Sequence, residues 1–87
     1  MAIRLTPRET QVVRLLSLGC TVREAAAILK LAPSTVDNHK LRAMTKLGTN
    51  KASLLTRLAI KQRITSLNDR LTSAEKRLSG RKNDGWN

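Results

Sequence analysis

Residues 21–48, TVREAAAILKLAPSTVDNHKLRAMTKLG, carry the strongest fold signal in the chain. Thr21 and Glu24 have the spacing of a capping box and predict the start of a helix. Pro33 ends that short helix and suits the first position of the next one, which we expect to stop at Gly48. Two short helices joined by a turn of about three residues are typical of a helix-turn-helix motif.

The helix that begins at Pro33 has two different faces when successive residues are turned by about 100°. With Val36 pointing inward, the outer face carries mostly short polar side chains: Ser34, Asn38, Leu41 and Thr45, flanked by Asp37 and Arg42. This face suits the major groove, because Asn pairs with adenine, Arg with guanine, and an apolar group contacts the thymine methyl. Asp37 has two interpretations: an acceptor for a cytosine amino group, or an acid that stabilises the helix N-terminus.

The sequence before and after this motif also predicts helices. Thr6-Pro7-Arg8-Glu9 is a second capping-box pattern, and the helix it starts should end near Gly19. A further helix is expected from about Asn50, carrying the apolar residues Leu54, Leu55, Leu58 and Ala59. Ala32, before Pro33, is a poor N-cap. No alternating apolar run indicates a strand, so we expect an all-α domain of four helices over residues 1–63.

Three strings in this order resemble the LuxR-type helix-turn-helix domain, also called GerE or NarL/FixJ-type. They are Leu5-Thr6-Pro7-Arg8-Glu9, Thr35-Val36-Asp37-Asn38-His39-Lys40 and Lys46-Leu47-Gly48. The resemblance covers about residues 4–63. It implies a DNA-binding domain of bacterial transcription regulators, such as the effector domain of a response regulator. In that family the third helix enters the major groove and the fourth supports dimerisation on DNA.

The resemblance also implies which residues contact DNA. The family's base-contacting positions correspond to Asp37, Asn38 and Leu41, with Arg42 close by. Its phosphate-contacting positions correspond to Thr21, Arg23, Ser34, Thr35 and Lys46. Double-stranded DNA is therefore the expected partner, and RNA polymerase is a candidate second partner.

Helical sequence continues beyond this domain, over residues 64–79. Its apolar residues follow the +4, +3 spacing of a coiled-coil seam: Ile60, Ile64, Leu67, Leu71, Ala74 and Leu78. We expect an extended helix that makes the protein a homodimer, at least on DNA, with Arg70 of one copy paired to Glu75 of the other. Because fewer than three heptads are marginal alone, a second interpretation stays open: the stripe folds back onto its own domain. Residues 80–87, which include Trp86, predict a disordered tail.

The charge of the chain favours a polyanionic partner. Its 17 Lys and Arg against 6 Asp and Glu give a net charge of +11 over 87 residues. Residues 1–63 contribute twelve of the cations and three of the acids, and no acid occurs between Asn38 and Asn68. The phosphate groups of a nucleic acid would neutralise this positive charge. With no apolar run long enough to span a membrane and no signal segment, we expect a cytoplasmic, nucleoid-associated protein.

Other functions have less support in the sequence. One His, one Cys and six acids form no triad, metal-ligand or phosphate-loop pattern, so we expect no enzyme activity, no metal, no cofactor and no small-molecule ligand. We interpret His39 as a half-buried, hydrogen-bonded residue beside the core and Cys20 as a small inert thiol. Two alternatives to a LuxR-type regulator remain open. One is a protein-interaction module built on residues 51–78, and the other is a promoter-binding module like sigma-factor region four.

Overall fold

The computed structural model describes residues 4–51, 54–65 and 68–80. Within these residues the chain forms helices and no strand. The helices are α1 (Pro7–Ser17), α2 (Val22–Leu29), α3 (Pro33–Leu47), α4 (Leu55–Lys61) and α5 (Ser73–Ser79). The all-α prediction is confirmed.

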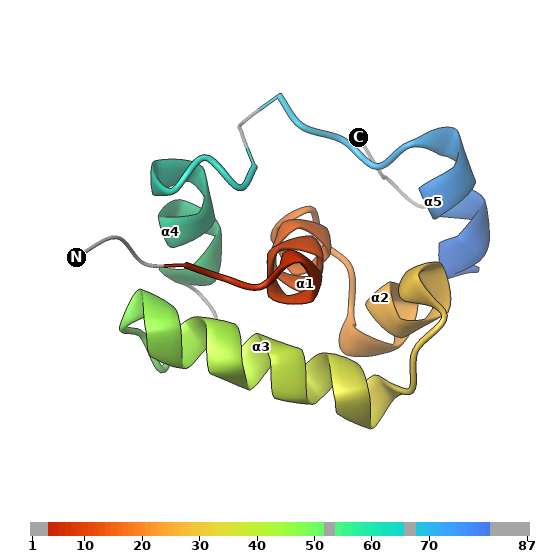
Figure 1. Ribbon diagram of the computed structural model, residues 1–87. Helices are drawn as coiled ribbons and strands as arrows, with labels where there is room; N and C mark the ends of the chain where they lie inside the picture. The colour runs from red at the N-terminus through yellow and green to blue at the C-terminus, as the bar shows by residue number, and fades with distance from the viewer. Residues whose placement is uncertain (1–3, 52–53, 66–67, 81–87) are drawn as a thin grey trace.

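Helix α1 is the centre of the fold (Figure 1). It packs against α2, α3 and α4, while α5 packs against α2. In Figure 1, α3 lies along one side of α1, and α4 and α5 lie at opposite ends of the molecule. This arrangement leaves the long side of α3 that faces away from α1 uncovered.

The first three helices begin and end where the local sequence predicts. The Thr6 hydroxyl accepts the Glu9 backbone N–H at 3.1 Å and Glu9 returns the bond to the Thr6 N–H at 3.0 Å, so the capping box is formed. Thr21 and Glu24 form the same pair at the start of α2. Ala32 caps α3 without a side-chain hydrogen bond, and α3 ends at Gly48, whose φ of 75° lies in the left-handed region.

Two apolar clusters hold the helices together. The first lies between α1, α2 and the start of α3, and includes Val12, Leu15 and Val36. The second joins α1 to the end of α3 and to α4 through Val13, Leu47 and other small or aliphatic side chains. Both clusters are mainly aliphatic. Cys20, at 6% exposure, is part of the first.

The uninterrupted helix predicted beyond Asn50 is wrong. Helix α4 starts at Leu55 and ends at Lys61, and among the residues that the structure describes after it the next helix starts at Ser73. Arg63 turns the chain with a φ of 60°, in the left-handed region. The fold-back interpretation describes this structure, because Leu71 is only 4% exposed and packs in the first cluster.

The other described residues of the predicted coiled-coil seam do not form one continuous apolar stripe either. Ile64 packs against the second cluster, Ile60 is half-buried, and Leu78 is 44% exposed. Leu67 and residues 81–87, with Trp86, lie outside the described residues. Glu75 accepts a bond from Arg14 of its own chain, and its pairing with Arg70 of a second copy stays a prediction. None of the described helices is long and apolar enough to cross a membrane.

Candidate nucleic-acid interface

The face of α3 that points away from α1 is polar and uncovered. The structure buries Val36, Ala43, Met44 and Leu47 on the inner side of α3. On the other side it leaves a set of side chains exposed, which are Ser34, Asn38, Leu41, Arg42 and Thr45. Leu41 is 51% exposed, more than Leu54 at 39% or Leu78 at 44%. The inward and outward sides of α3 therefore agree with the predicted helical wheel.

Asp37, the acidic residue among the predicted base contacts, has a partner in the structure. Lys40 Nζ lies 3.3 Å from Asp37 Oδ1, one turn further along α3. The Asp37 side chain is still 47% exposed. Lys40 compensates its charge next to the uncovered face, which lowers the cost of bringing this carboxylate near phosphates.

The predicted phosphate contacts lie at the starts of α2 and α3 and at the end of α3. Thr21 is the exposed N-cap of α2, and its hydroxyl already accepts the Glu24 backbone N–H, while Arg23 is exposed in the first turn of the helix. Ser34 is exposed and Thr35 half-buried at the start of α3. Backbone N–H groups at a helix start attract anions, so both sites suit a phosphate.

Lys46, the remaining predicted phosphate contact, forms an ion pair with an acid that was not predicted as its partner. Lys46 Nζ lies 2.7 Å from Glu9 Oε1, and Glu9 is 2% exposed. The hydrogen bond from Lys46 holds the pKa of Glu9 below its ordinary value, against the opposing effect of burial. A Glu in a capping box gives no sign of a lysine partner 37 residues later in the sequence.

His39 lies near this pair on the half-buried side of α3. Its charge helps to lower the pKa of Glu9. The residue is half-buried, as expected, but its buried Nδ1 atom has no hydrogen-bond partner among the described residues. The hydrogen bond predicted for His39 is therefore missing at this atom.

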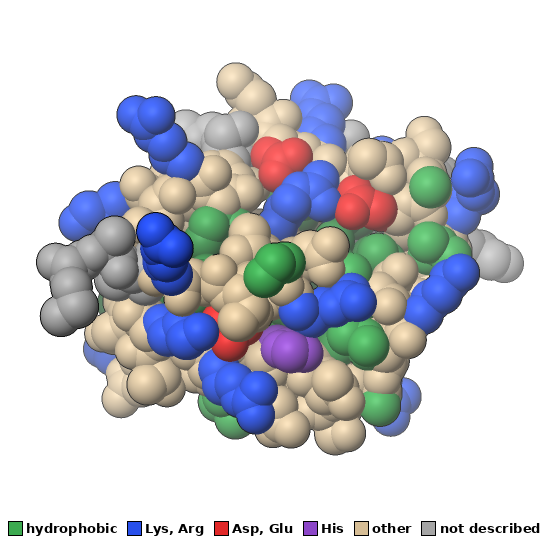
Figure 2. All heavy atoms as spheres, in the orientation of Figure 1, with side chains coloured by type: hydrophobic (Ala, Val, Ile, Leu, Met, Phe, Trp, Pro, Cys, Tyr) green, Lys and Arg blue, Asp and Glu red, His purple; other side chains and the backbone are tan. Residues whose placement is uncertain are grey.

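The described acids are all engaged within the chain, whereas most cations are not. Glu9 and Asp37 pair with lysines, Glu24 accepts the Thr21 N–H, and Asp69 and Glu75 pair with Arg14. Among the described cations, ion pairs involve Arg14, Lys40 and Lys46. Figure 2 shows Lys and Arg side chains spread across the face in view, with fewer acids between them. The surface therefore presents mainly uncompensated positive charge, which attracts polyanions.

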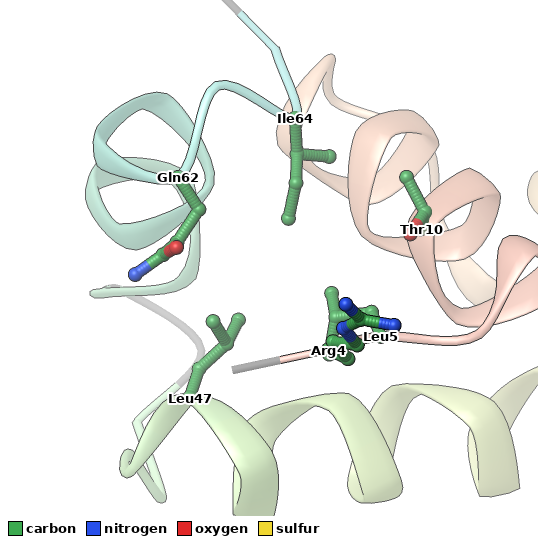
Figure 3. Close-up of a pocket in the computed structure, with 6 residues that line it drawn as sticks. All are labelled: Arg4, Leu5, Thr10, Leu47, Gln62 and Ile64. Carbon is green, nitrogen blue, oxygen red and sulfur yellow. The ribbon is translucent and has the colours of Figure 1, made fainter. Parts of the chain in front are cut away.

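One hollow lies away from the uncovered face of α3. A cavity of about 290 Å³ is lined by Arg4, Leu5, Thr10, Leu47, Gln62 and Ile64 (Figure 3). Figure 3 places these side chains between α1, the end of α3 and the end of α4. Arg4 is its single charged residue. Within the described part of the chain no group of His, Cys, Asp or Glu could hold a metal ion.

Comparison with known proteins identifies the family. A model described as "Bacterial regulatory proteins, luxR family" matches residues 4–59. The response regulator Rre1 of Synechocystis sp. is 40% identical over 60 residues, which are 69% of this chain and 26% of the relative. The transcriptional regulatory protein UhpA of Escherichia coli is 45% identical over 53 residues, 61% of this chain and 27% of UhpA.

A third relative is the uncharacterized response regulatory protein YgeK of Escherichia coli. It is 31% identical over 64 residues, 74% of this chain and 44% of YgeK. The chain thus spans less than half the length of each of these relatives. No solved structure matches significantly. The family match and the all-helical fold agree with the sequence analysis. The chain belongs to the LuxR family of bacterial regulatory proteins.

Proposed function

We propose that the protein is a sequence-specific transcription regulator that inserts α3 into the major groove of double-stranded DNA. The observation that carries this proposal is the uncovered polar face of α3. Asn38 and Arg42 offer hydrogen bonds to base edges there, and Leu41 offers an apolar surface to a thymine methyl. Asp37, compensated by Lys40, is the fourth base-contacting residue of the proposal.

The phosphate contacts proposed around this face would provide affinity rather than sequence selection. Thr21 and Arg23 would contact one strand from the start of α2, and Ser34 and Thr35 from the start of α3. Lys46 would contact a phosphate while Glu9 holds its ammonium group in place. The released counterions would make binding strongly dependent on salt.

The proposed assembly is a homodimer on DNA that acts at the bacterial nucleoid, with RNA polymerase as a candidate partner. Two copies on adjacent half-sites would read a repeated motif, as is usual for helix-turn-helix dimers.

The two alternative functions have less support. The family match extends over residues 4–59 and favours a LuxR-type domain over a module like sigma-factor region four. An assembly surface built on residues 51–78 would draw on α4 and α5 together. The structure instead places α4 and α5 at opposite ends of the molecule (Figure 1).

A salt titration of duplex binding tests the proposal. The protein is added to a fluorescein-labelled random-sequence duplex, and anisotropy is recorded between about 50 and 200 mM salt. We expect the logarithm of the affinity to fall linearly with the logarithm of salt, with a slope of about 0.9 per phosphate contacted. Affinity that is absent at low salt, or insensitive to salt, would refute the proposal and favour an apolar assembly function.

A further inference from the structure

The cavity of about 290 Å³ between α1, α3 and α4 opens at one edge of the second apolar cluster. The described side chains that line it are Arg4, Leu5, Thr10, Leu47, Gln62 and Ile64. Leu47 is a buried member of that cluster, and Leu5 and Ile64 pack against it half-buried. Figure 3 shows Leu47 and Ile64 directed into this space from the end of α3 and from the turn after α4. The cavity therefore has an apolar wall that the described side chains leave incompletely covered.

The other three lining residues are polar, and their side chains have no partner within the described part of the chain. The guanidinium of Arg4, the hydroxyl of Thr10 and the amide of Gln62 make no hydrogen bond or ion pair there. Arg4 and Gln62 are exposed, and Thr10 is half-buried. All three side chains can donate hydrogen bonds. An apolar hollow with a few polar groups around it is the usual arrangement of a small-molecule site.

The charge that lines this cavity is positive. Arg4 supplies it, and no acid occurs among the described lining residues. The acid next to Thr10 in the sequence is Glu9, which is 2% exposed and paired with Lys46. Because a guanidinium pairs with a carboxylate through two parallel hydrogen bonds, a carboxylate is the anionic group that Arg4 fits. A phosphate fits less well, since its further oxygens would meet the apolar wall without hydrogen-bond donors.

We propose that this cavity binds a short aliphatic monocarboxylate. The carboxylate pairs with Arg4, with Thr10 and Gln62 as further donors, and the hydrocarbon chain covers Leu47 and Ile64. The cavity volume lies at the small end of the range for ligand sites, which favours a chain of a few carbons over a drug-sized molecule. The sequence does not predict this ligand, because the lining residues come from three separate segments that only the fold brings together.

The ligand would contact both of the helices that the Lys46–Glu9 ion pair joins. Leu47 directly follows Lys46 on α3, and Thr10 directly follows Glu9 on α1. A molecule held between Leu47 and Thr10 adds contacts between the end of α3 and α1 that exist only in the folded chain. Binding therefore stabilises the fold by mass action. The inference does not rest on the proposed function, because the site and its test concern the protein without DNA.

The test uses the full chain with isotope-labelled leucine and isoleucine methyl groups, observed by nuclear magnetic resonance. Hexanoate and hexylamine are the probes, because they share the same hydrocarbon chain and carry opposite charges at neutral pH. Each probe is titrated to about 20 mM at constant ionic strength. The methyl groups of Leu5, Leu47 and Ile64 report on the cavity. Those of Leu41 and Leu78, which are exposed elsewhere, report on non-specific binding.

Two variants make the same change of net charge at different places. Arg4→Glu reverses the charge at the cavity, and the exposed Arg4 side chain has no partner among the described residues to lose. Arg8→Glu is the matched control, because Arg8 bonds to Gln11 within α1 and is not among the residues that line the cavity. The methyl spectrum recorded without a probe checks that each variant keeps the fold.

We expect hexanoate to shift the cavity methyl signals saturably in the wild type and in Arg8→Glu, with a Kd of about 1 mM. Hexylamine should bind more weakly, and the signals of Leu41 and Leu78 should not move. In Arg4→Glu the preference should reverse in favour of hexylamine. The inference would be overturned by a wild type that shows no saturable shift, that binds hexylamine as well as hexanoate, or that shifts Leu41 and Leu78 equally. A folded Arg4→Glu variant that still prefers hexanoate would also overturn it, and the two probes on the wild type decide the matter if that variant does not fold.

Discussion

Lys46 and Glu9 form an ion pair, with 2.7 Å between Nζ and Oε1, that joins the last turn of α3 to the first turn of α1. The same Glu9 oxygen accepts the Thr6 backbone N–H at 3.0 Å. One buried carboxylate therefore caps the central helix and fixes the orientation of the helix proposed to read DNA. Because Lys46 is also a proposed phosphate contact, the pair links the stability of the fold to the position of the interface.

Removing Lys46 should lower the free energy of unfolding more than removing Glu9. Lys46→Met leaves a carboxylate that is 2% exposed without its cation, whereas Glu9→Gln leaves a half-exposed ammonium that water can solvate. We expect Lys46→Met to lower the free energy of unfolding by about 2–3 kcal/mol and Glu9→Gln by about 1 kcal/mol. Urea denaturation measures both, with Lys30→Met on the surface as control. Equal, small effects of Lys46→Met and Lys30→Met would show that the pair contributes little.

Acid should destabilise the fold through three carboxylates. The pKa of Asp69 is lowered chiefly by the hydrogen bonds of Arg14. Burial raises the pKa of Glu75, but the Thr72 N–H and Arg14 outweigh it, and the pKa of Glu9 is lowered by Lys46. A folded-state pKa below the unfolded value means that the stabilisation is complete above the unfolded pKa and is lost as pH falls through the folded pKa.

The free energy of unfolding should therefore be level above about pH 5.5 and decline steadily below about pH 4.5. Urea titrations at a series of pH values measure this decline. The triple variant Glu9→Gln, Asp69→Asn, Glu75→Gln should start lower and decline less steeply. A triple variant with the same slope as the wild type would mean that other groups cause the acid sensitivity.

Leu71→Ala should be far more damaging than Leu78→Ala, although both remove the same atoms from one predicted seam. Leu71 is 4% exposed in the core and Leu78 is 44% exposed on α5. We expect a loss of about 2–5 kcal/mol in the free energy of unfolding for Leu71→Ala. The change for Leu78→Ala should be within about 0.5 kcal/mol. Thermal or urea unfolding distinguishes them, and similar losses would contradict the docked position of Leu71.

Ala32→Ser should stabilise the protein. Ala32 already has the extended backbone of an N-cap, with φ of −71° and ψ of 145°, but no side-chain acceptor for the first N–H groups of α3. A serine hydroxyl there should add about 0.5–1 kcal/mol. Ala27→Ser, exposed within α2, is the control and should be neutral or slightly destabilising. No gain from Ala32→Ser would indicate that the cap geometry differs from the one described.

The sequence predicted the helices whose boundaries depend on neighbouring residues. Thr6, Thr21 and Pro33 mark helix starts through bonds or fixed angles within three residues, so they can be recognised without the fold. The uncovered side of α3 follows from helical periodicity in the same way. For this reason the placement of Asn38 and Leu41 on the outside agrees with the prediction.

The break between α4 and α5 depends on residues far apart in the sequence. Arg14 contacts Asp69 across 55 positions, and a regular heptad spacing gives no sign of that contact. The capping box of Thr72 and Glu75 was a local signal for the start of α5, of the same kind as at Thr6 and Thr21. The heptad pattern competes with this signal, because its apolar spacing is satisfied equally by a straight helix and by a folded-back segment.

The most direct test of base recognition by α3 is a selection from a random duplex library, carried out with the wild type and with Asn38→Ala. The Asn38 side chain is exposed on α3 and makes no hydrogen bond among the described residues, so its loss should leave the fold intact. The wild type should enrich a repeated half-site motif. Asn38→Ala should lose the preference at one position of each half-site, by about 1–3 kcal/mol. A wild type that enriches no motif, or an Asn38→Ala variant that enriches the same motif at every position, would contradict reading of the sequence by α3.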